Sequence, residues 1–149
     1  MLVLINHINS LSLRRNKLRV VVVDDNVIYR RLLSRMLKKY HASSIASVIE
    51  FECPVKALTH LSHFEVDALF MDIDMPTLQG THATKIIRSS PSHHILPHNR
   101  EIPIIAFSTN CRDEDILSYV KAGMDGFMEK PLRPSTLHSI ISRIKDSII

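Results

Sequence analysis

Five polar side chains of the kinds used in phosphoryl transfer each stand at or just after the end of a short apolar run: Asp24, Asp25, Asp72, Ser108 and Lys130. If the three carboxylates were brought together they would repel one another unless a cation balanced them. Mg²⁺ is the expected cation, because it is hard, prefers oxygen and is usually held by one or two carboxylates. No soft ligand is in place to favour zinc.

Asp72 is the expected nucleophile, because its apolar run is the most central. A carboxylate attacks an anionic phosphoryl group poorly unless the transferring oxygens are neutralised. Mg²⁺ and Lys130 would supply that neutralisation, and the Ser108 hydroxyl would donate a hydrogen bond to a third phosphoryl oxygen. An aspartyl phosphate carries about −1.5 to −2 charges and would draw Ser108 and Lys130 toward it, letting Phe127 change between exposed and buried rotamers. Taken alone, Phe127 reads more simply as a core residue.

The elements that must position these residues alternate between β-branched apolar runs and amphipathic stretches, which is typical of βαβ units. Strands are predicted at residues 18–23, 45–51, 66–71, 102–107 and 125–129. Helices are predicted at residues 28–40, from Pro54 to 61, from a Thr81 cap to 87, at 113–122 closed by Gly123, and at 134–144, while 89–101 is predicted to be a loop. The predicted fold is α/β, a doubly wound five-stranded parallel sheet flanked by five helices in three layers, with the functional residues at the carboxyl ends of the strands.

Length and composition indicate the number of domains, the absence of a membrane span and the compartment. With 149 residues, 45% of them apolar and 23% charged, the chain suits one folded domain. We expect a flexible extension at residues 1–17, the domain at 18–146 and no separate output domain. No apolar run is long enough to cross a bilayer. Cys53 and Cys111 form no zinc or disulfide pattern, which indicates a reducing compartment, cytoplasm or possibly nucleus.

Nine of the nineteen basic residues lie between Arg14 and Lys39. A solvated helix face with a basic tail explains them without nucleic acid, since no recognition-helix or zinc-finger pattern accompanies them. We therefore expect neither nucleic-acid binding nor a membrane partner. His93, His94 and His98, in the predicted loop, are expected to be surface residues and not a transition-metal site.

Four motifs, taken in order, resemble the receiver domain of two-component response regulators, which has the flavodoxin-like fold of CheY. They are VVVDDN at 21–26, LFMDIDMP at 69–76, FST at 107–109 and EKP at 129–131. The likeness spans about residues 18–146. The AGMDGF run at 122–127 and the long loop look more like receivers of eukaryotic hybrid-kinase relays, such as fungal stress pathways.

The resemblance implies a role for each matching residue. Asp72 would be phosphorylated by a histidine kinase or a histidine phosphotransfer protein. Asp25 and Asp72 would bind Mg²⁺ directly, Asp24 through water, and the Asp74 backbone carbonyl would be a further ligand. Ser108 and Phe127 would be the switch pair and Lys130 the phosphate partner, while Asp74 and Asn110 would influence the lifetime of the phosphoryl group. The chain would then be a signalling switch that catalyses only its own phosphorylation and dephosphorylation, and a downstream protein would read it.

The sequence leaves two alternative functions open. A haloacid-dehalogenase-like phosphatase also has an Asp nucleophile in a DxD motif, which residues 72–74 fit. In that family, however, the nucleophile strand comes first and the acidic pair last, the reverse of the order here. A docking module that works without phosphorylation is the other alternative.

Overall fold

The computed structural model describes residues 17–148, and the extension expected at residues 1–17 lies outside them except for Lys17. A single parallel sheet holds five strands in the order β2-β1-β3-β4-β5. The strands are β1 (Leu18–Val23), β2 (Ile45–Phe51), β3 (Ala68–Asp72), β4 (Ile104–Ser108) and β5 (Gly126–Glu129). The predicted doubly wound α/β fold is confirmed.

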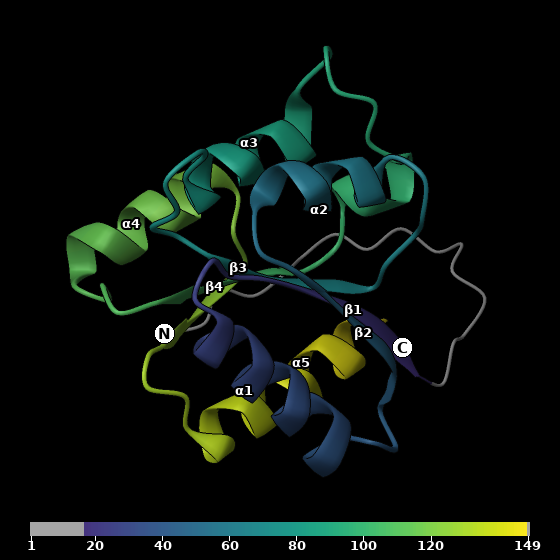
Figure 1. Ribbon diagram of the computed structural model, residues 1–149, viewed down its shortest axis with the longest axis vertical. Coiled ribbons are helices and arrows are strands. Elements are labelled where there is room, and N and C mark those ends of the chain that lie inside the picture. The colour runs from purple at the N-terminus through teal and green to yellow at the C-terminus, as the bar shows by residue number, and fades with distance from the viewer. Residues whose placement is uncertain (1–16, 149) are drawn as a thin grey trace.

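Helices cover both faces of the sheet, as Figure 1 shows. They are α1 (Val27–Tyr40), α2 (Pro54–Leu61), α3 (Gly80–Ser89), α4 (Asp113–Ala122) and α5 (Pro134–Ile148), with a short 3-10 helix, η1 (Pro97–Arg100). One apolar cluster joins the sheet to α2, α3 and α4, and a second joins it to α1 and α5. Because β3 lies at the centre and is buried at every residue, it has apolar neighbours on both faces.

Two central strands begin later than the sequence predicted. Val66 was expected in β3, but its N–H donates to the Asn99 side chain instead of to a neighbouring strand. Ile102 was expected in β4, but its carbonyl accepts from Arg88, and Pro103 has no N–H to offer. β5 likewise begins at Gly126, because the carboxylate of Asp125 bonds the Ile104 N–H and the Arg88 guanidinium.

The predicted Thr81 cap of the third helix was wrong. The helix begins at Gly80, with Gln79 before it in extended conformation and no side-chain cap. Gly80 is needed for close approach: a Cβ there would lie 2.0 Å from the Asp72 carbonyl oxygen. Its N–H also donates to the Ile73 carbonyl at 2.9 Å. The residue therefore fixes α3 directly against the end of β3.

The loop between α3 and β4 is tied down and contains η1, which the sequence did not predict. Arg100 donates to the carbonyls of Ile87, Ser90 and His93. Asn99, fully buried, donates to the carbonyls of Leu61 and Phe64. Two side chains of the loop thus satisfy backbone carbonyls of the loop itself and of the ends of the neighbouring helices α2 and α3.

Candidate functional site

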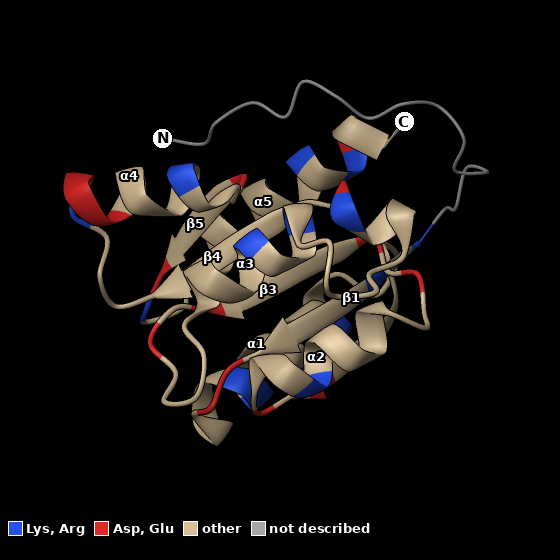
Figure 2. Ribbon diagram, turned by 90° about the horizontal axis from the view of Figure 1, so that it is seen from above, with Lys and Arg blue, Asp and Glu red and all other residues tan. Residues whose placement is uncertain are grey.

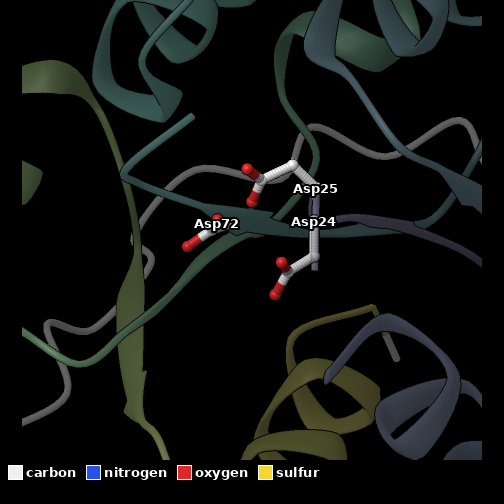
Figure 3. A group of neighbouring side chains, drawn as sticks. All are labelled: Asp24, Asp25 and Asp72. Atoms are coloured by element: carbon white, nitrogen blue, oxygen red, sulfur yellow. The ribbon is translucent and has the colours of Figure 1, made fainter. Parts of the chain in front are cut away.

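Three carboxylates meet at the carboxyl end of the sheet, as predicted. Asp24 and Asp25 follow β1, and Asp72 is the last residue of β3; one oxygen of each lies within 4.8 Å of the others. Figure 3 shows the three side chains together at this end of the sheet. Asp24 and Asp72 are buried, whereas Asp25 is exposed. The cluster is therefore shielded from solvent at Asp24 and Asp72 and open to solvent at Asp25.

Lys130, directly after β5, is the counter-ion of the two buried acids. Its Nζ lies 2.7 Å from Asp24 Oδ2 and donates to Asp72 Oδ1 at 3.1 Å. Asp72 Oδ1 also accepts from the Ile73 N–H, and Asp24 Oδ1 accepts from the Asn26 N–H. Asp24 Oδ2 is buried and has no hydrogen-bond partner of good geometry among the described residues, although the ammonium is close. This oxygen is therefore balanced by the charge of the ammonium and accepts no hydrogen bond of good geometry from the described residues.

Two aromatic rings, which sequence reasoning missed, flank the lysine. Lys130 Nζ lies 4.5 Å from the centre of the Tyr29 ring and 4.8 Å from that of Phe107. The rings meet edge to face with centres 5.9 Å apart. A cation over aromatic faces is attracted by their quadrupoles, so the rings hold the ammonium in the site. Phe107 stands beside Ser108 in the FST motif, but nothing in the sequence indicated Tyr29.

Burial and charge shift the protonation of this group. Burial, and then the charge of Asp24, raise the pKa of Asp72 to about 7, although Lys130 opposes the shift. Burial alone would lower the pKa of Lys130, but the close contact with the Asp24 carboxylate and the charge of Asp72 outweigh it and raise that pKa. Lys130 is therefore an ammonium at neutral pH. Asp72 takes up a proton far more readily than an exposed aspartate unless a further cation is present.

Ser108 reaches the same end of the sheet on β4, but its hydroxyl is engaged on the α4 side. Its Oγ accepts the Asn110 N–H at 3.0 Å and lies 3.2 Å from the Tyr119 hydroxyl. The Asn110 side chain donates to Asp74 Oδ2 at 2.9 Å. Asp74 and Asn110, both exposed, thus bridge the loops that follow β3 and β4. Tyr119 was not singled out from the sequence, and its helical position gave no signal of this contact.

The remaining predicted residues have simple surroundings. Phe127, on β5, is half-buried and packs against the same apolar cluster as Tyr119. His93 and His94 are exposed, and His98 Nε2 contacts the Val66 carbonyl at 2.9 Å. The only group of three or more metal-type side chains within residues 17–148 is the aspartate cluster.

The local sequence explains why the acids face the site. Asn26 caps α1 by accepting the N–H groups of Ile28 and Tyr29. Arg30, one turn into this helix, donates to the Asp24 carbonyl at 2.7 Å. The turn after β1 is therefore fixed at both ends, which places Asp24 inward and Asp25 outward.

The donor set fits Mg²⁺. All three side chains offer hard oxygen, one buried oxygen has no good hydrogen-bond partner, and the exposed Asp25 leaves room for the waters that Mg²⁺ keeps. The excess of negative charge over the single lysine also favours a cation. Soft sulfur ligands are not part of this group.

Comparison with known proteins points in the same direction. A family model described as "Response regulator receiver domain" matches residues 20–142. The transcription factor SKN7 of Saccharomyces cerevisiae is 33% identical, covering 94% of this chain and 21% of that protein. Stress response regulator protein 1 of Candida tropicalis is also 33% identical, over 78% of this chain and 41% of that protein. The chain thus spans about a fifth and about two fifths of these relatives.

A solved structure has a similar fold. The receiver domain of the sensor histidine kinase PA1611 from Pseudomonas aeruginosa is 25% identical, with a TM-score of 0.73 over 87% of this chain and 98% of that one. It is described with a magnesium ion coordinated in the active-site cleft.

Proposed function

Because the chain belongs to the response regulator receiver domain family, we propose that Asp72 is the residue on which it accepts a phosphoryl group. Receiver domains of two-component systems take this group from histidine kinases, and they act as signalling switches. The observation that supports Asp72 most directly is its position beside the positive charge of Lys130 and the negative charges of Asp24 and Asp25. Its carboxylate is bonded by the Lys130 ammonium and lies within 4.8 Å of Asp24 and Asp25.

In the proposed reaction an Asp72 oxygen forms a bond to phosphorus while the bond from phosphorus to the donor's histidine nitrogen breaks. The imidazole leaves with the electron pair of that bond. Lys130 would exchange its bond to Asp72 for one to a phosphoryl oxygen, and Ser108 would donate to another. Hydrolysis restores the unphosphorylated protein: water adds to phosphorus, the bond to Asp72 breaks, and inorganic phosphate leaves.

Mg²⁺ would be held by Asp25 and Asp72, by Asp24 through water and by the Asp74 backbone carbonyl. When bound it would neutralise the transferring oxygens and the crowded acids. Asp74 and Asn110, whose side chains bridge the loops after β3 and β4, would influence how long the phosphoryl group persists. Phe127 would change its packing as Ser108 moves.

At the level of the cell, the proposal is a phosphorelay in stress or environmental signalling, in the cytoplasm or nucleus. The donor would be a histidine kinase or a histidine phosphotransfer protein, and a downstream protein would read the altered surface. Direct contact with nucleic acid is not part of the proposal. Among residues 17–148 no helix is long and apolar enough to span a bilayer. The chain would catalyse only its own phosphorylation and dephosphorylation.

The test is incubation with acetyl phosphate and Mg²⁺, followed by intact mass measurement. We expect one added phosphoryl group in wild type and none in Asp72→Asn. Asp113→Asn, which removes an exposed acid from α4, is the matched control and should behave as wild type. A docking module would incorporate nothing in any variant. A phosphatase of the haloacid-dehalogenase type would instead turn over many equivalents of p-nitrophenyl phosphate.

A further inference from the structure

Tyr119 stands where the switch hydroxyl and helix α4 meet. Its side chain is 3% exposed, and its hydroxyl lies 3.2 Å from Ser108 Oγ and 2.5 Å from the Asn110 carbonyl oxygen. Burial raises the pKa of Tyr119, although its bond to Ser108 opposes the shift. The phenol is therefore protonated at neutral pH and available for hydrogen bonding.

We propose that Tyr119 is a positioning residue that holds the Ser108 hydroxyl on the α4 side of the site and releases it when Asp72 is phosphorylated. This inference rests on the proposed function. Whichever oxygen takes the single phenolic proton, movement of Ser108 Oγ toward a phosphoryl oxygen breaks its contact with Tyr119. Phosphorylation and the Tyr119 bond thus compete for one hydroxyl group.

The competition for Ser108 should affect α4, because few buried side chains attach this helix to the rest of the domain. Only Tyr119 and Ala122, of the ten residues of this helix, are buried. The first turn carries Asp113, Glu114 and Asp115, drawn red at the end of α4 in Figure 2. Asp113 and Glu114 are exposed, whereas Asp115 is half-buried and accepts from the Arg112 N–H. A helix with so few buried side chains is held weakly, so the loss of one buried hydrogen bond changes a large share of its attachment.

The aromatic residue of β5 cannot make the same contact. Phe127 has no hydroxyl, and it packs against the apolar cluster to which Tyr119 belongs. The polar link between Ser108 and this side of the molecule therefore comes from α4. Release of Tyr119 would loosen the helix and the packing of Phe127 together.

The first experiment measures the affinity for beryllofluoride, a phosphoryl mimic, by calorimetry in the presence of Mg²⁺. Tyr119→Phe removes the hydroxyl but keeps the ring, and it should raise the affinity about fivefold, as the loss of one competing hydrogen bond would. Tyr40→Phe, at an exposed tyrosine on α1, is the matched control and should leave the affinity unchanged. Melting temperatures of all variants verify that they are folded.

A double-mutant cycle separates this role from general packing. In a Ser108→Ala background the competing hydroxyl is gone, so Tyr119→Phe should have no further effect on affinity. An equal gain in both backgrounds, or no gain in either, would overturn the proposal. If wild type bound no beryllofluoride and Asp72 incorporated no phosphoryl group, the proposed function itself would fall, and the Tyr119 inference with it.

Hydrogen exchange of the α4 amides gives a second readout. In wild type, the amides of residues 116–122 should exchange faster once beryllofluoride is bound. In Tyr119→Phe they should already exchange fast without it. Identical protection of α4 in the two free proteins would contradict the inference even if the affinities differed.

Discussion

Lys130 Nζ is closer to Asp24, at 2.7 Å, than to Asp72, at 3.1 Å. The lysine side chain is 6% exposed, so neither bond is replaced readily by water. Lys130 is thus a structural partner of Asp24 as much as it is a partner of the predicted acceptor. Its removal leaves two buried carboxylates without their counter-ion.

Replacing Lys130 by alanine should therefore lower stability as well as phosphorylation. Breaking a buried ion pair on one side costs about 3 kcal/mol or more, because a buried charge remains. Urea unfolding should show this loss without Mg²⁺, and added Mg²⁺ should recover part of it. Lys85→Ala, at an exposed lysine of α3, is the control and should change little. Equal stability of the two variants would mean that Lys130 does not balance the buried acids.

The stability of the metal-free protein should depend on the protonation of Asp72. Its pKa is raised from 3.8 to about 7, so the protonated carboxyl favours the fold. This contribution is fully present below about pH 4 and is lost as the pH rises through 7. Unfolding free energies between pH 4 and 8 should therefore fall more steeply in wild type than in Asp72→Asn. Parallel pH profiles for the two proteins would contradict the raised pKa.

Magnesium should reverse that trend. Metal ligation requires the carboxylate, so binding of Mg²⁺ competes with the proton on Asp72. We expect the affinity measured by calorimetry to increase from pH 6 to 8, with proton release at the lower pH. An affinity independent of pH over this range would speak against Asp72 as a ligand.

The start of α3 can be tested by two alanine substitutions in neighbouring positions. Gly80→Ala would place a Cβ 2.0 Å from the Asp72 carbonyl oxygen, so α3 must shift, and a melting temperature lower by several degrees is expected. Thr81→Ala should be nearly neutral, because Thr81 does not cap the helix. If Thr81→Ala were the more harmful change, the helix would begin as the sequence suggested.

We predict that the basic outer face of α1 is the docking surface for the phosphoryl donor. Arg31 and Arg35 are exposed there beside Ile28, which is 72% exposed, and the helix begins next to the aspartate cluster. Charge reversal of Arg31 and Arg35 should slow transfer from an acidic phosphotransfer protein at low salt. Phosphorylation by acetyl phosphate, which needs no docking, should be unchanged. If both reactions slowed equally, the substitutions would have damaged the site and not a docking surface.

The sequence predicted the fold and the convergence of the acids because both follow from short-range rules. Val-rich runs predict buried parallel strands, and parallel strands bring their carboxyl ends to one edge. Thus Asp24, Asp25, Asp72 and Lys130 could be placed together before any coordinates were known. The roles assigned to Ser108, Phe127, Asp74 and Asn110 stay predictions until phosphorylation is measured.

What the sequence could not predict depends on contacts between distant segments. Tyr29 and Tyr119 lie on different helices, and their meeting with Lys130 and Ser108 depends on side-chain packing. The late starts of β3 and β4 have the same origin, because Asn99 and Arg88 take backbone groups that the strands would otherwise use. Thr81 failed as a cap because the approach of Gly80 to Asp72 sets the helix start.

Arg88, on α3, ties together the segments that lead into β4 and β5. Its guanidinium donates to the carbonyls of Gly123, Arg100 and Ile102 and to the Asp125 carboxylate, which itself accepts the Ile104 N–H. The segment that leads into β4 is therefore anchored, so we expect Ser108 to move by local bending near the end of β4 and not by sliding of the whole strand. The central sheet would serve as a rigid frame in both signalling states, and the information would travel through the loops and helices around it.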